Sequence, residues 1–325
     1  ELDGLLIRRV MSFPVMRSGS SAGCLTHESA NQLGLTTSVV VAVGTIDAHA
    51  GAIGTLSFSV ESGHQNAMCV IGGTSTCCMS VSREKHFVRG VWGPYADAVL
   101  PNWWVLEGGV SASGLLIELL VASHPAWTDV VNEASKQHVN VYDCLNEHVA
   151  RLAKTDPFAT RHLHIDPDVH GNRSVLDDPE CRGTVMGISL QRDVSDLVLL
   201  YWATVQALAY ATRSIVRAVA VKRNEPFRAV YATGGLSKNS LWLQEHANAL
   251  QLPVYAAKED CMLWGVSCLA SVGAGLCASV EDAMKSLVAP FHQVLPDAAT
   301  ASFHERKFGI YLDLQEFQKR ARERK

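Results

Sequence analysis

The 325-residue sequence lacks the cysteine patterns that mark secreted or metal-binding proteins. It contains nine cysteines, but no two are spaced as CxxC and their intervals are irregular. An odd, unpatterned set of cysteines is typical of a reduced, intracellular protein. We therefore expect a cytoplasmic location.

The sequence also has no excess of basic residues, and its first residues show no leader-like pattern. Its 28 Lys and Arg against 32 Asp and Glu give a formal net charge of −4, so nucleic acid is not an expected partner. The first residues, ELDGLLIRRV, show no charged segment followed by an apolar one, and we expect no signal peptide. There is no initiator Met, which suggests that the chain begins inside a longer protein.

No long hydrophobic run is free of polar residues. The most apolar helix candidate, residues 194–221, is interrupted by Asp196, Gln206, Arg213 and Arg217. This composition predicts a buried core helix and no membrane partner. The apolar fraction of 48% is typical of a globular protein, and the length allows two domains.

An acidic residue stands where an apolar run gives way to small residues. Residues 39–43 are β-branched apart from Ala42, which predicts a buried strand, and Asp47 follows it. Open α/β sheets bind ligands past the carboxyl ends of their strands, so Asp47 is a catalytic candidate. The alternative is that Asp47 caps a helix starting at Ala48, because Asp is a favoured N-cap residue.

Three glycine turns accompany this acid. Residues 71–76, IGGTST, join two predicted strands, and their backbone N–H groups could converge on an anion or simply form a hairpin turn. Residues 230–240, VYATGGLSKNS, place a glycine pair between a strand and a helix, which suits a nucleotide or a plain tight turn. A third turn, residues 106–114, also leads into a helix.

Two other groups could carry chemistry. His162, His164 and His170 lie near two carboxylates, and the alternation of His162 with His164 would place both rings on one strand face. Asp-Pro-Asp between them predicts a turn that separates His170, so we expect no metal site. For the vicinal Cys77 and Cys78 we expect one buried thiol and a packing role.

The order of predicted elements indicates an α/β protein with hairpin and crossover units. A strand-like piece at residues 4–11 and a capped helix at 26–34 precede the Asp47 segment, and residues 1–58 are too few to close a core. A hairpin (67–71 and 76–81), aromatic-rich strands (87–106), a helix (111–122) and the long helix follow. Beyond it we expect strand 227–232, helix 239–250, strand 252–257 and helices 263–276 and 303–324.

Taken in order, several segments resemble the FGGY carbohydrate kinases, closest to the D-ribulokinase-like branch. They are GTIDAHAGAIG, VIGGTSTCCMS, GVWGPY, LEGGVSASG, HGNRS, TGGLSKNSLWLQEHANALQLPV and MLWGVSCLASVGAGL. The resemblance implies an actin-like, ribonuclease-H-like ATPase fold. It also implies ATP-dependent phosphorylation of a sugar hydroxyl, with Mg²⁺, on a ketopentose such as D-ribulose, and it allows a homodimer.

The same resemblance implies roles for single residues. Asp47 matches the general base that takes the proton of the attacking hydroxyl, a role that needs only a carboxylate within hydrogen-bond reach. The residues that match nucleotide contacts are Gly73, Thr74, Gly109, Ser113, Gly234, Gly235 and Asn239. Gly265 matches a family glycine at the head of the last core helix.

The resemblance divides the chain into residues 1–58, the end of an N-terminal sugar-binding domain, and residues 59–325, a C-terminal nucleotide-binding domain. The family's first phosphate loop, with its Asp and Gly-Thr, does not precede Glu1. We expect the chain alone to bind adenine nucleotide weakly and to turn over sugar poorly. Alternatives are a kinase of another polyol or ketose and a non-catalytic actin-like nucleotide-binding module.

Overall fold

A seven-stranded mixed β-sheet forms the centre of the structure, a computed structural model that describes residues 15–59, 63–288 and 290–323. The strand order is β11-β10-β9-β3-β4-β6-β5. Strands β3, β9 and β10 are parallel, whereas β4, β6, β5 and β11 run antiparallel to their neighbours. The bounds are β3 Ala67–Gly72, β4 Thr76–Ser82, β5 Trp92–Ala96, β6 Trp104–Val110, β9 Ala229–Thr233, β10 Val254–Ala257 and β11 Phe291–Val294.

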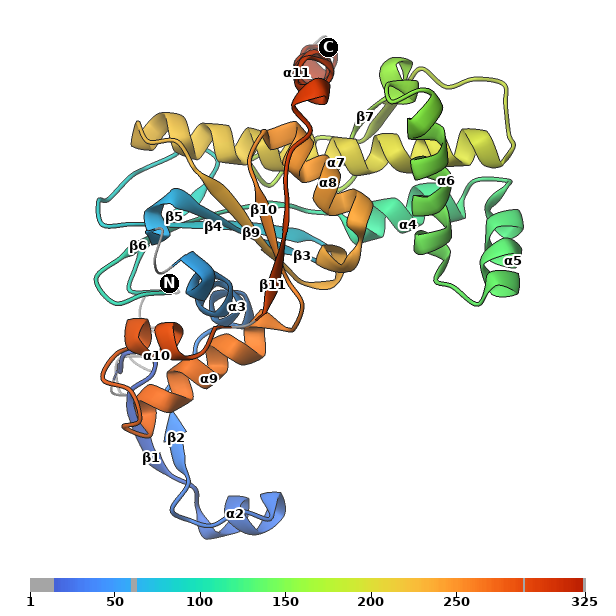
Figure 1. The fold of residues 1–325 in the computed structure, drawn as a ribbon. Coiled ribbons are helices and arrows are strands. Elements are labelled where there is room, and N and C mark those ends of the chain that lie inside the picture. The colour runs from blue at the N-terminus through green and yellow to red at the C-terminus, as the bar shows by residue number, and fades with distance from the viewer. Residues whose placement is uncertain (1–14, 60–62, 289, 324–325) are drawn as a thin grey trace.

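Helices cover both faces of this sheet, as Figure 1 shows. Alternate residues of a strand point to opposite faces, and β3 follows this rule. Met68 and Val70 pack in the core under α7 and α8, whereas Ala67 and Cys69 pack in the core over α3, α9 and α10. The sheet is therefore buried on both sides, which explains why β3 and β9 are almost entirely apolar.

Ten α-helices are described, and several begin or end at residues suited to that position. Asp193 caps α7 by accepting from the Asp196 backbone N–H, and Asn239 caps α8 by accepting from that of Trp242. Asn224 ends α7 in the left-handed conformation. The helices are α2 His27–Leu33, α3 Asp47–Leu56, α4 Gly114–Ala122, α5 Trp127–Gln137, α6 Val141–Thr155, α7 Val194–Arg223, α8 Ser240–Leu250, α9 Cys261–Gly273, α10 Val280–Ser286 and α11 Ala301–Glu323.

The long helix α7 crosses one face of the sheet and extends beyond it to a lobe formed by α4, α5 and α6 (Figure 1). It is the one helix in the described residues long and apolar enough to cross a membrane, but 72% of its most apolar window is buried inside this fold. Tyr201, Leu197 and Ile215 along it are fully buried. The expected core helix is thus confirmed.

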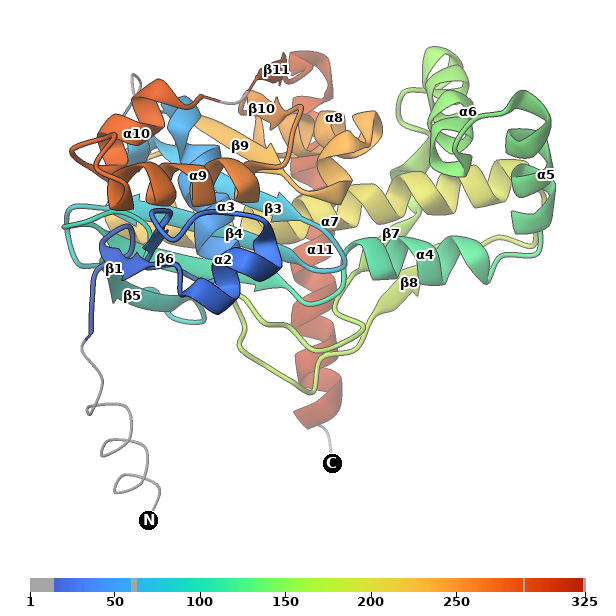
Figure 2. The ribbon, with the colours of Figure 1, turned by 90° about the horizontal axis from the view of Figure 1, so that it is seen from below.

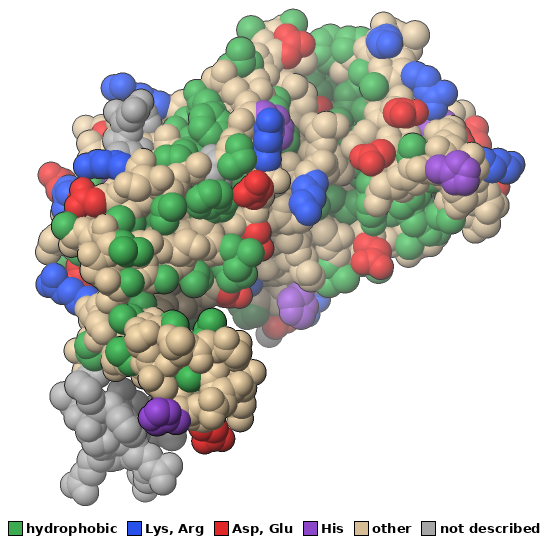
Figure 3. All heavy atoms as spheres, turned by 60° about the horizontal axis from the view of Figure 1, so that its bottom comes forward, with side chains coloured by type: hydrophobic (Ala, Val, Ile, Leu, Met, Phe, Trp, Pro, Cys, Tyr) green, Lys and Arg blue, Asp and Glu red, His purple; other side chains and the backbone are tan. Residues whose placement is uncertain are grey.

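Two small sheets lie outside the central one. Strands β1 (Ser21–Cys24) and β2 (Val40–Ala42) form an antiparallel ribbon that contacts α9, and α2 lies at its far end (Figure 1). Figure 2 shows β1 and α2 from below. Strands β7 (His164–Asp166) and β8 (Thr184–Met186) form the second pair. In the view of Figure 3, acidic and basic side chains are interspersed over the surface.

Helices α3 and α9 approach each other closely through two glycines. A Cβ added to Gly54 would lie 2.0 Å from the Cys261 carbonyl oxygen, and one added to Gly265 would lie 1.8 Å from that of Ala50. No side chain fits in either direction, so both positions require glycine. This contact fixes α3, and with it Asp47, against α9.

The structure corrects several expectations. Residues 39–43 do not form a buried strand: β2 pairs only with β1 in the described residues, and Val41 is 41% exposed, because α9 packs against one side of this two-stranded ribbon and leaves the other side open. The helix expected from residue 111 begins at Gly114, and α10, β11 and the β7–β8 pair were not predicted. The hairpin of β3 and β4 is confirmed, whereas the strand expected at 4–11 lies outside the described residues.

Candidate functional site

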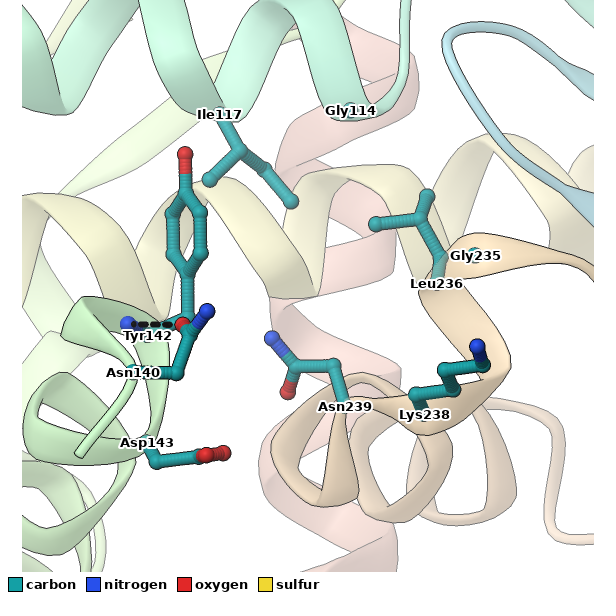
Figure 4. A pocket seen from close by; sticks show the side chains of 9 residues that line it. All are labelled: Gly114, Ile117, Asn140, Tyr142, Asp143, Gly235, Leu236, Lys238 and Asn239. Carbon is teal, nitrogen blue, oxygen red and sulfur yellow. Dashed lines mark hydrogen bonds between the residues drawn. The ribbon is translucent and has the colours of Figure 1, made fainter.

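A pocket of about 430 Å³ lies where three elements meet beside one end of the central sheet (Figure 4). Helix α4 contributes Gly114 and Ile117, the start of α6 contributes Asn140, Tyr142 and Asp143, and the turn after β9 contributes the remaining residues. Those residues are Gly235, Leu236, Lys238 and Asn239. Ile117 and Leu236 supply apolar surface, while Asp143 and Lys238 are exposed charges of opposite sign.

The turn after β9 has two glycines with different surroundings. Gly234 has a φ of +91°, and a Cβ there would lie 2.4 Å from the Gly72 carbonyl oxygen, so this glycine allows the turn to pack on the end of β3. Gly235 has nothing within 4 Å of such a Cβ and lines the pocket. Of the two predicted contacts, only Gly235 faces the cavity.

Asn239 is held at the pocket wall by a closed set of hydrogen bonds. Its Nδ2 donates to the Tyr201 hydroxyl at 2.7 Å, and that hydroxyl donates to Asn146 Oδ1 at 2.8 Å. Asn146 Nδ2 in turn donates to Asn239 Oδ1 at 3.2 Å, and the same oxygen accepts from Trp242 N at 3.1 Å. The amide therefore has one orientation, with one Nδ2 hydrogen not used in this set.

Burial keeps Tyr201 in its neutral form as a partner of this network. Loss of solvent around the phenol raises the pKa of Tyr201 far above its usual value, while the hydrogen bond from Asn239 opposes that rise. A neutral hydroxyl can accept from Asn239 and donate to Asn146 at once. The orientation of Asn239 is therefore independent of pH in the neutral range.

The β3–β4 turn is tied to the start of α4. The carbonyl of Gly73 accepts from Gly114 N at 3.0 Å, and that of Thr74 accepts from Ser113 N at 2.8 Å. Gly73 N donates within the turn, to the Ser75 carbonyl, while the side chain of Thr74 is exposed. The turn thus lies beside the pocket wall formed by α4, with Thr74 at its surface.

Ser113 is placed differently from the other predicted contacts. Its side chain is fully buried, and its Oγ accepts from Thr76 Oγ1 at 2.7 Å. It does not line the pocket and instead connects the start of α4 to β4.

Asp47 lies exposed in the first turn of α3. The helix begins at Asp47 itself, with Ile46 as its N-cap residue, so the expected capping role at a helix starting from Ala48 is wrong in register. Its Oδ1 still accepts the Ala48 N–H at 2.7 Å, and a carboxylate is favourable at this end of a helix. The acid does not line the pocket of Figure 4.

A polar cluster on the α3 face of the sheet surrounds Gly109. His49 Nε2 on α3 lies 3.6 Å from Glu107 Oε2 on β6, and Gly109 pairs with Cys77 on β4. Burial, together with the negative charges of Glu107 and Asp47, raises the pKa of the Cys77 thiol, whereas the Arg173 guanidinium opposes that rise. Asp47 and Gly109 therefore lie on the same face, within electrostatic range of one thiol.

Gly109 is a glycine for a steric reason. A Cβ there would lie 2.8 Å from the Thr76 carbonyl oxygen and 2.9 Å from Arg173 Nη1, so the arginine passes directly over it. Its N–H donates to Ser174 Oγ at 3.2 Å. Motif comparison drew attention to Gly109 but not to Arg173, although Arg173 lies within the segment HGNRS.

The three histidines lie in different settings. His162 lies in a 3₁₀ turn and is exposed, His164 is buried on β7, and His170 is exposed beyond it. The predicted shared face of His162 and His164 is wrong, because β7 begins only at His164. Within the described residues, ligand-type atoms come together elsewhere, at Glu133, Cys144 and His148, where His148 Nε2 lies 2.9 Å from Glu133 Oε2.

Of the pocket residues that were not predicted, only one group could have been recognised from the sequence. Lys238 adjoins the predicted Asn239 and belongs to the same motif. Tyr142 and Asp143 follow an ordinary helix cap, in which Asn140 Oδ1 accepts from Tyr142 N at 2.8 Å, and nothing in that pattern indicates a ligand.

Residues 68–274 match the model of the FGGY family of carbohydrate kinases, C-terminal domain. The chain is 40% identical over 308 residues to an FGGY carbohydrate kinase domain-containing protein of Danio rerio, covering 91% of this chain and 56% of that protein. It is 32% identical over 260 residues to a D-ribulokinase of Saccharomyces cerevisiae, covering 74% of this chain and 36% of that protein. The chain thus spans little more than half the length of the Danio rerio relative.

Solved structures agree with the expected fold. The xylulose kinase from Rhodospirillum rubrum superposes with a TM-score of 0.73 at 21% identity, covering 96% of this chain and 58% of that one. The Plasmodium falciparum glycerol kinase with ADP gives a TM-score of 0.71 at 13% identity, covering 94% of this chain and 56% of that one. The actin-like, ribonuclease-H-like α/β fold is therefore confirmed.

Proposed function

This chain belongs to the FGGY family of carbohydrate kinases, and from that premise we propose that it takes part in ATP-dependent phosphorylation of a sugar hydroxyl. The observation that carries the proposal is the pocket of about 430 Å³ formed where two of the predicted glycine-turn segments meet the start of α6. A cavity of this size accommodates a nucleoside. In this proposal the sugar hydroxyl approaches Asp47, which lies exposed at the start of α3.

In the proposed complex, the base of ATP packs against Ile117 and Leu236. Asn239 offers its remaining Nδ2 hydrogen to the nucleoside, and its fixed orientation lowers the entropy cost of that contact. Lys238 at the rim supplies positive charge for the phosphates. The nucleotide roles of Gly73, Thr74, Gly109, Ser113 and Gly234 are then mostly structural: they shape the turns and hold α4 and Arg173 in place.

We assign the general-base role to Asp47. Phosphoryl transfer demands in-line positioning and charge stabilisation more than proton removal, so an exposed carboxylate at the start of a rigid helix suffices. In the forward step, the sugar oxygen attacks the γ-phosphorus, the bond from that phosphorus to the β,γ-bridging oxygen breaks, and the hydroxyl proton passes to Asp47. Mg²⁺ bound together with ATP would supply further neutralisation of the phosphate charge.

For the substrate we propose a ketopentose, with D-ribulose as the first choice. Its support is the similarity to a D-ribulokinase at 32% identity. Another polyol or ketose is the alternative, favoured by the structural likeness to a xylulose kinase and a glycerol kinase. The division into residues 1–58 of a sugar-binding domain and 59–325 of a nucleotide-binding domain belongs to the same proposal.

Two measurements test the proposal. Calorimetric titration of this chain with ADP should give weak but saturable binding. ADP release coupled to a dye reaction should then be followed with a panel of ketopentoses and polyols, in the chain and in a form extended by the upstream domain of a relative.

The Asp47→Asn variant distinguishes a loss of the general base from a loss of the folded structure. We expect the extended protein to lose at least a hundredfold in kcat on this change, while ADP affinity stays constant, because Asp47 does not line the nucleotide pocket. His27→Asn, on the distant helix α2, is the control and should change neither quantity. Equal turnover of the Asp47→Asn and unsubstituted proteins would remove the assignment.

A further inference from the structure

Arg173 lies across the backbone of β6 at a position that only glycine allows. Its Nη1 would be 2.9 Å, and its Cδ 3.2 Å, from a Cβ at Gly109. The residue belongs to the irregular segment between β7 and β8 and comes to this place from 64 residues away in the chain. Both the aliphatic part and the charged end of this side chain therefore pack over the strand at Gly109.

The guanidinium is held by neutral partners. Its central carbon lies 5.2 Å from the centroid of the Trp92 ring on β5, and its positive charge lowers the pKa of the nearby Cys77 thiol against the effect of burial. Among the described residues, no carboxylate lies within the 4.0 Å that would make an ion pair with it. A half-buried cation thus stands oriented on the sheet face without a counter-charge in direct contact.

Arg173 lies near both the β3–β4 turn and the first turn of α3, which carries Asp47. On the neighbouring strand β4, Gly109 pairs with Cys77 and Val110 pairs with Thr76. The β3–β4 turn ends just before Thr76, so it lies about two residues, or roughly 7 Å, from the level of Gly109. In the other direction Glu107 is also two residues away, and it contacts His49 in the same helix turn as Asp47. The guanidinium therefore lies between the first turn of α3 and the β3–β4 turn.

We propose that Arg173 binds the γ-phosphoryl group of ATP, and this inference rests on the proposed function. A planar guanidinium can donate two parallel N–H···O bonds to phosphate oxygens, and these charge-assisted bonds are stronger than neutral ones. In the proposed complex the transferred group lies between the nucleotide and the base Asp47, and Arg173 lies over Gly109 on the same face of the sheet as Asp47. Its contact with the reacting group makes it a catalytic residue, and Gly109 is the residue that positions it.

The test compares a diphosphate with a triphosphate. Calorimetry with ADP and with the non-hydrolysable β,γ-imido analogue of ATP should show that Arg173→Gln weakens binding of the analogue at least tenfold while ADP affinity changes less than twofold. Arg173→Lys retains the charge without the fork and should show a smaller loss. A structural role for the arginine would affect both nucleotides alike.

Arg83→Gln is the matched control, because the Arg83 guanidinium also lies over an aromatic ring, that of Trp103 at 4.0 Å, at the other end of β4. It should leave the ratio of the two affinities unchanged. An unchanged ratio in both Arg173 variants would overturn the assignment of Arg173 while leaving the proposed function in place. Absence of binding of either nucleotide to the unsubstituted chain would overturn the proposed function and this assignment with it.

Discussion

Replacement of Gly265 by alanine should separate α3 from α9. The new Cβ would lie 1.8 Å from the Ala50 carbonyl oxygen and 3.1 Å from Gly54 N. A non-bonded carbon and oxygen need roughly 3.3 Å, so the two helix backbones must move apart by about 1.5 Å. Interiors are packed too tightly to absorb such a shift locally, because the buried Ile53 and Leu269 belong to the same core.

We expect Gly265→Ala to lower the free energy of unfolding by about 3 kcal/mol, the upper end of the range for overpacked cores. For a chain of this size that corresponds to a fall of about 6 °C in the thermal midpoint. Differential scanning calorimetry, with urea unfolding followed by tryptophan fluorescence, measures both quantities.

The chain offers a matched control in Gly309, which lies exposed in α11. A Cβ there meets nothing within 4 Å, so Gly309→Ala should be neutral or raise stability by up to about 1 kcal/mol through lower entropy of the unfolded chain. If Gly265→Ala were as stable as Gly309→Ala, the steric argument for the α3–α9 contact would be refuted.

Two further changes test the pocket wall and a buried acid. Asn239→Asp retains the oxygen that caps α8, but it loses the donor to Tyr201 and adds negative charge near Asp143. ADP affinity should therefore fall about tenfold in calorimetric titration, and an unchanged affinity would contradict this role of Asn239. Glu245 is buried and accepts a hydrogen bond from Trp202, and burial raises its pKa to about 7 from 4.5. Between pH 4.5 and 7 the folded chain therefore binds more protons at this carboxyl than the unfolded chain does. Its contribution to stability is therefore fully present below pH 4.5 and is lost as pH rises through 7. Glu245→Gln mimics the protonated acid, and its stability relative to the unsubstituted chain should grow by about 3 kcal/mol between pH 4.5 and 8, measured by urea unfolding at each pH; a constant difference would show that the carboxyl titrates normally.

The sequence predicted the elements that depend on periodicity and caps. Helix α7 and the β3–β4 hairpin follow from apolar pattern and turn chemistry, which act over a few residues. Short elements without such a pattern, such as α10 and β11, were not predicted. The burial of β2 was predicted wrongly, because strand propensity in residues 39–43 says nothing about which element covers the strand.

The candidate site divides in the same way. Gly235 and Asn239 were found because they belong to one local motif, and both line the pocket. The link of Asn239 to Tyr201 and Asn146 joins residues 38 and 93 positions away in the chain, and no local pattern encodes it. The same holds for Arg173 over Gly109, where the only signal in the sequence is a glycine whose reason lies in another segment.

The backbone contact of Gly54 and Gly265 has a mechanical consequence for Asp47. The carbonyl oxygens of Ala50 and Cys261 lie directly against the backbone of the opposing helix. Because neither helix can shift toward the other, we expect α3 and α9 to move together. Helix α9 follows β10 after a few residues that include Asp260, its cap. A change in the loop between β10 and α9 that shifts α9 should therefore also shift α3, and with it the proposed proton acceptor Asp47.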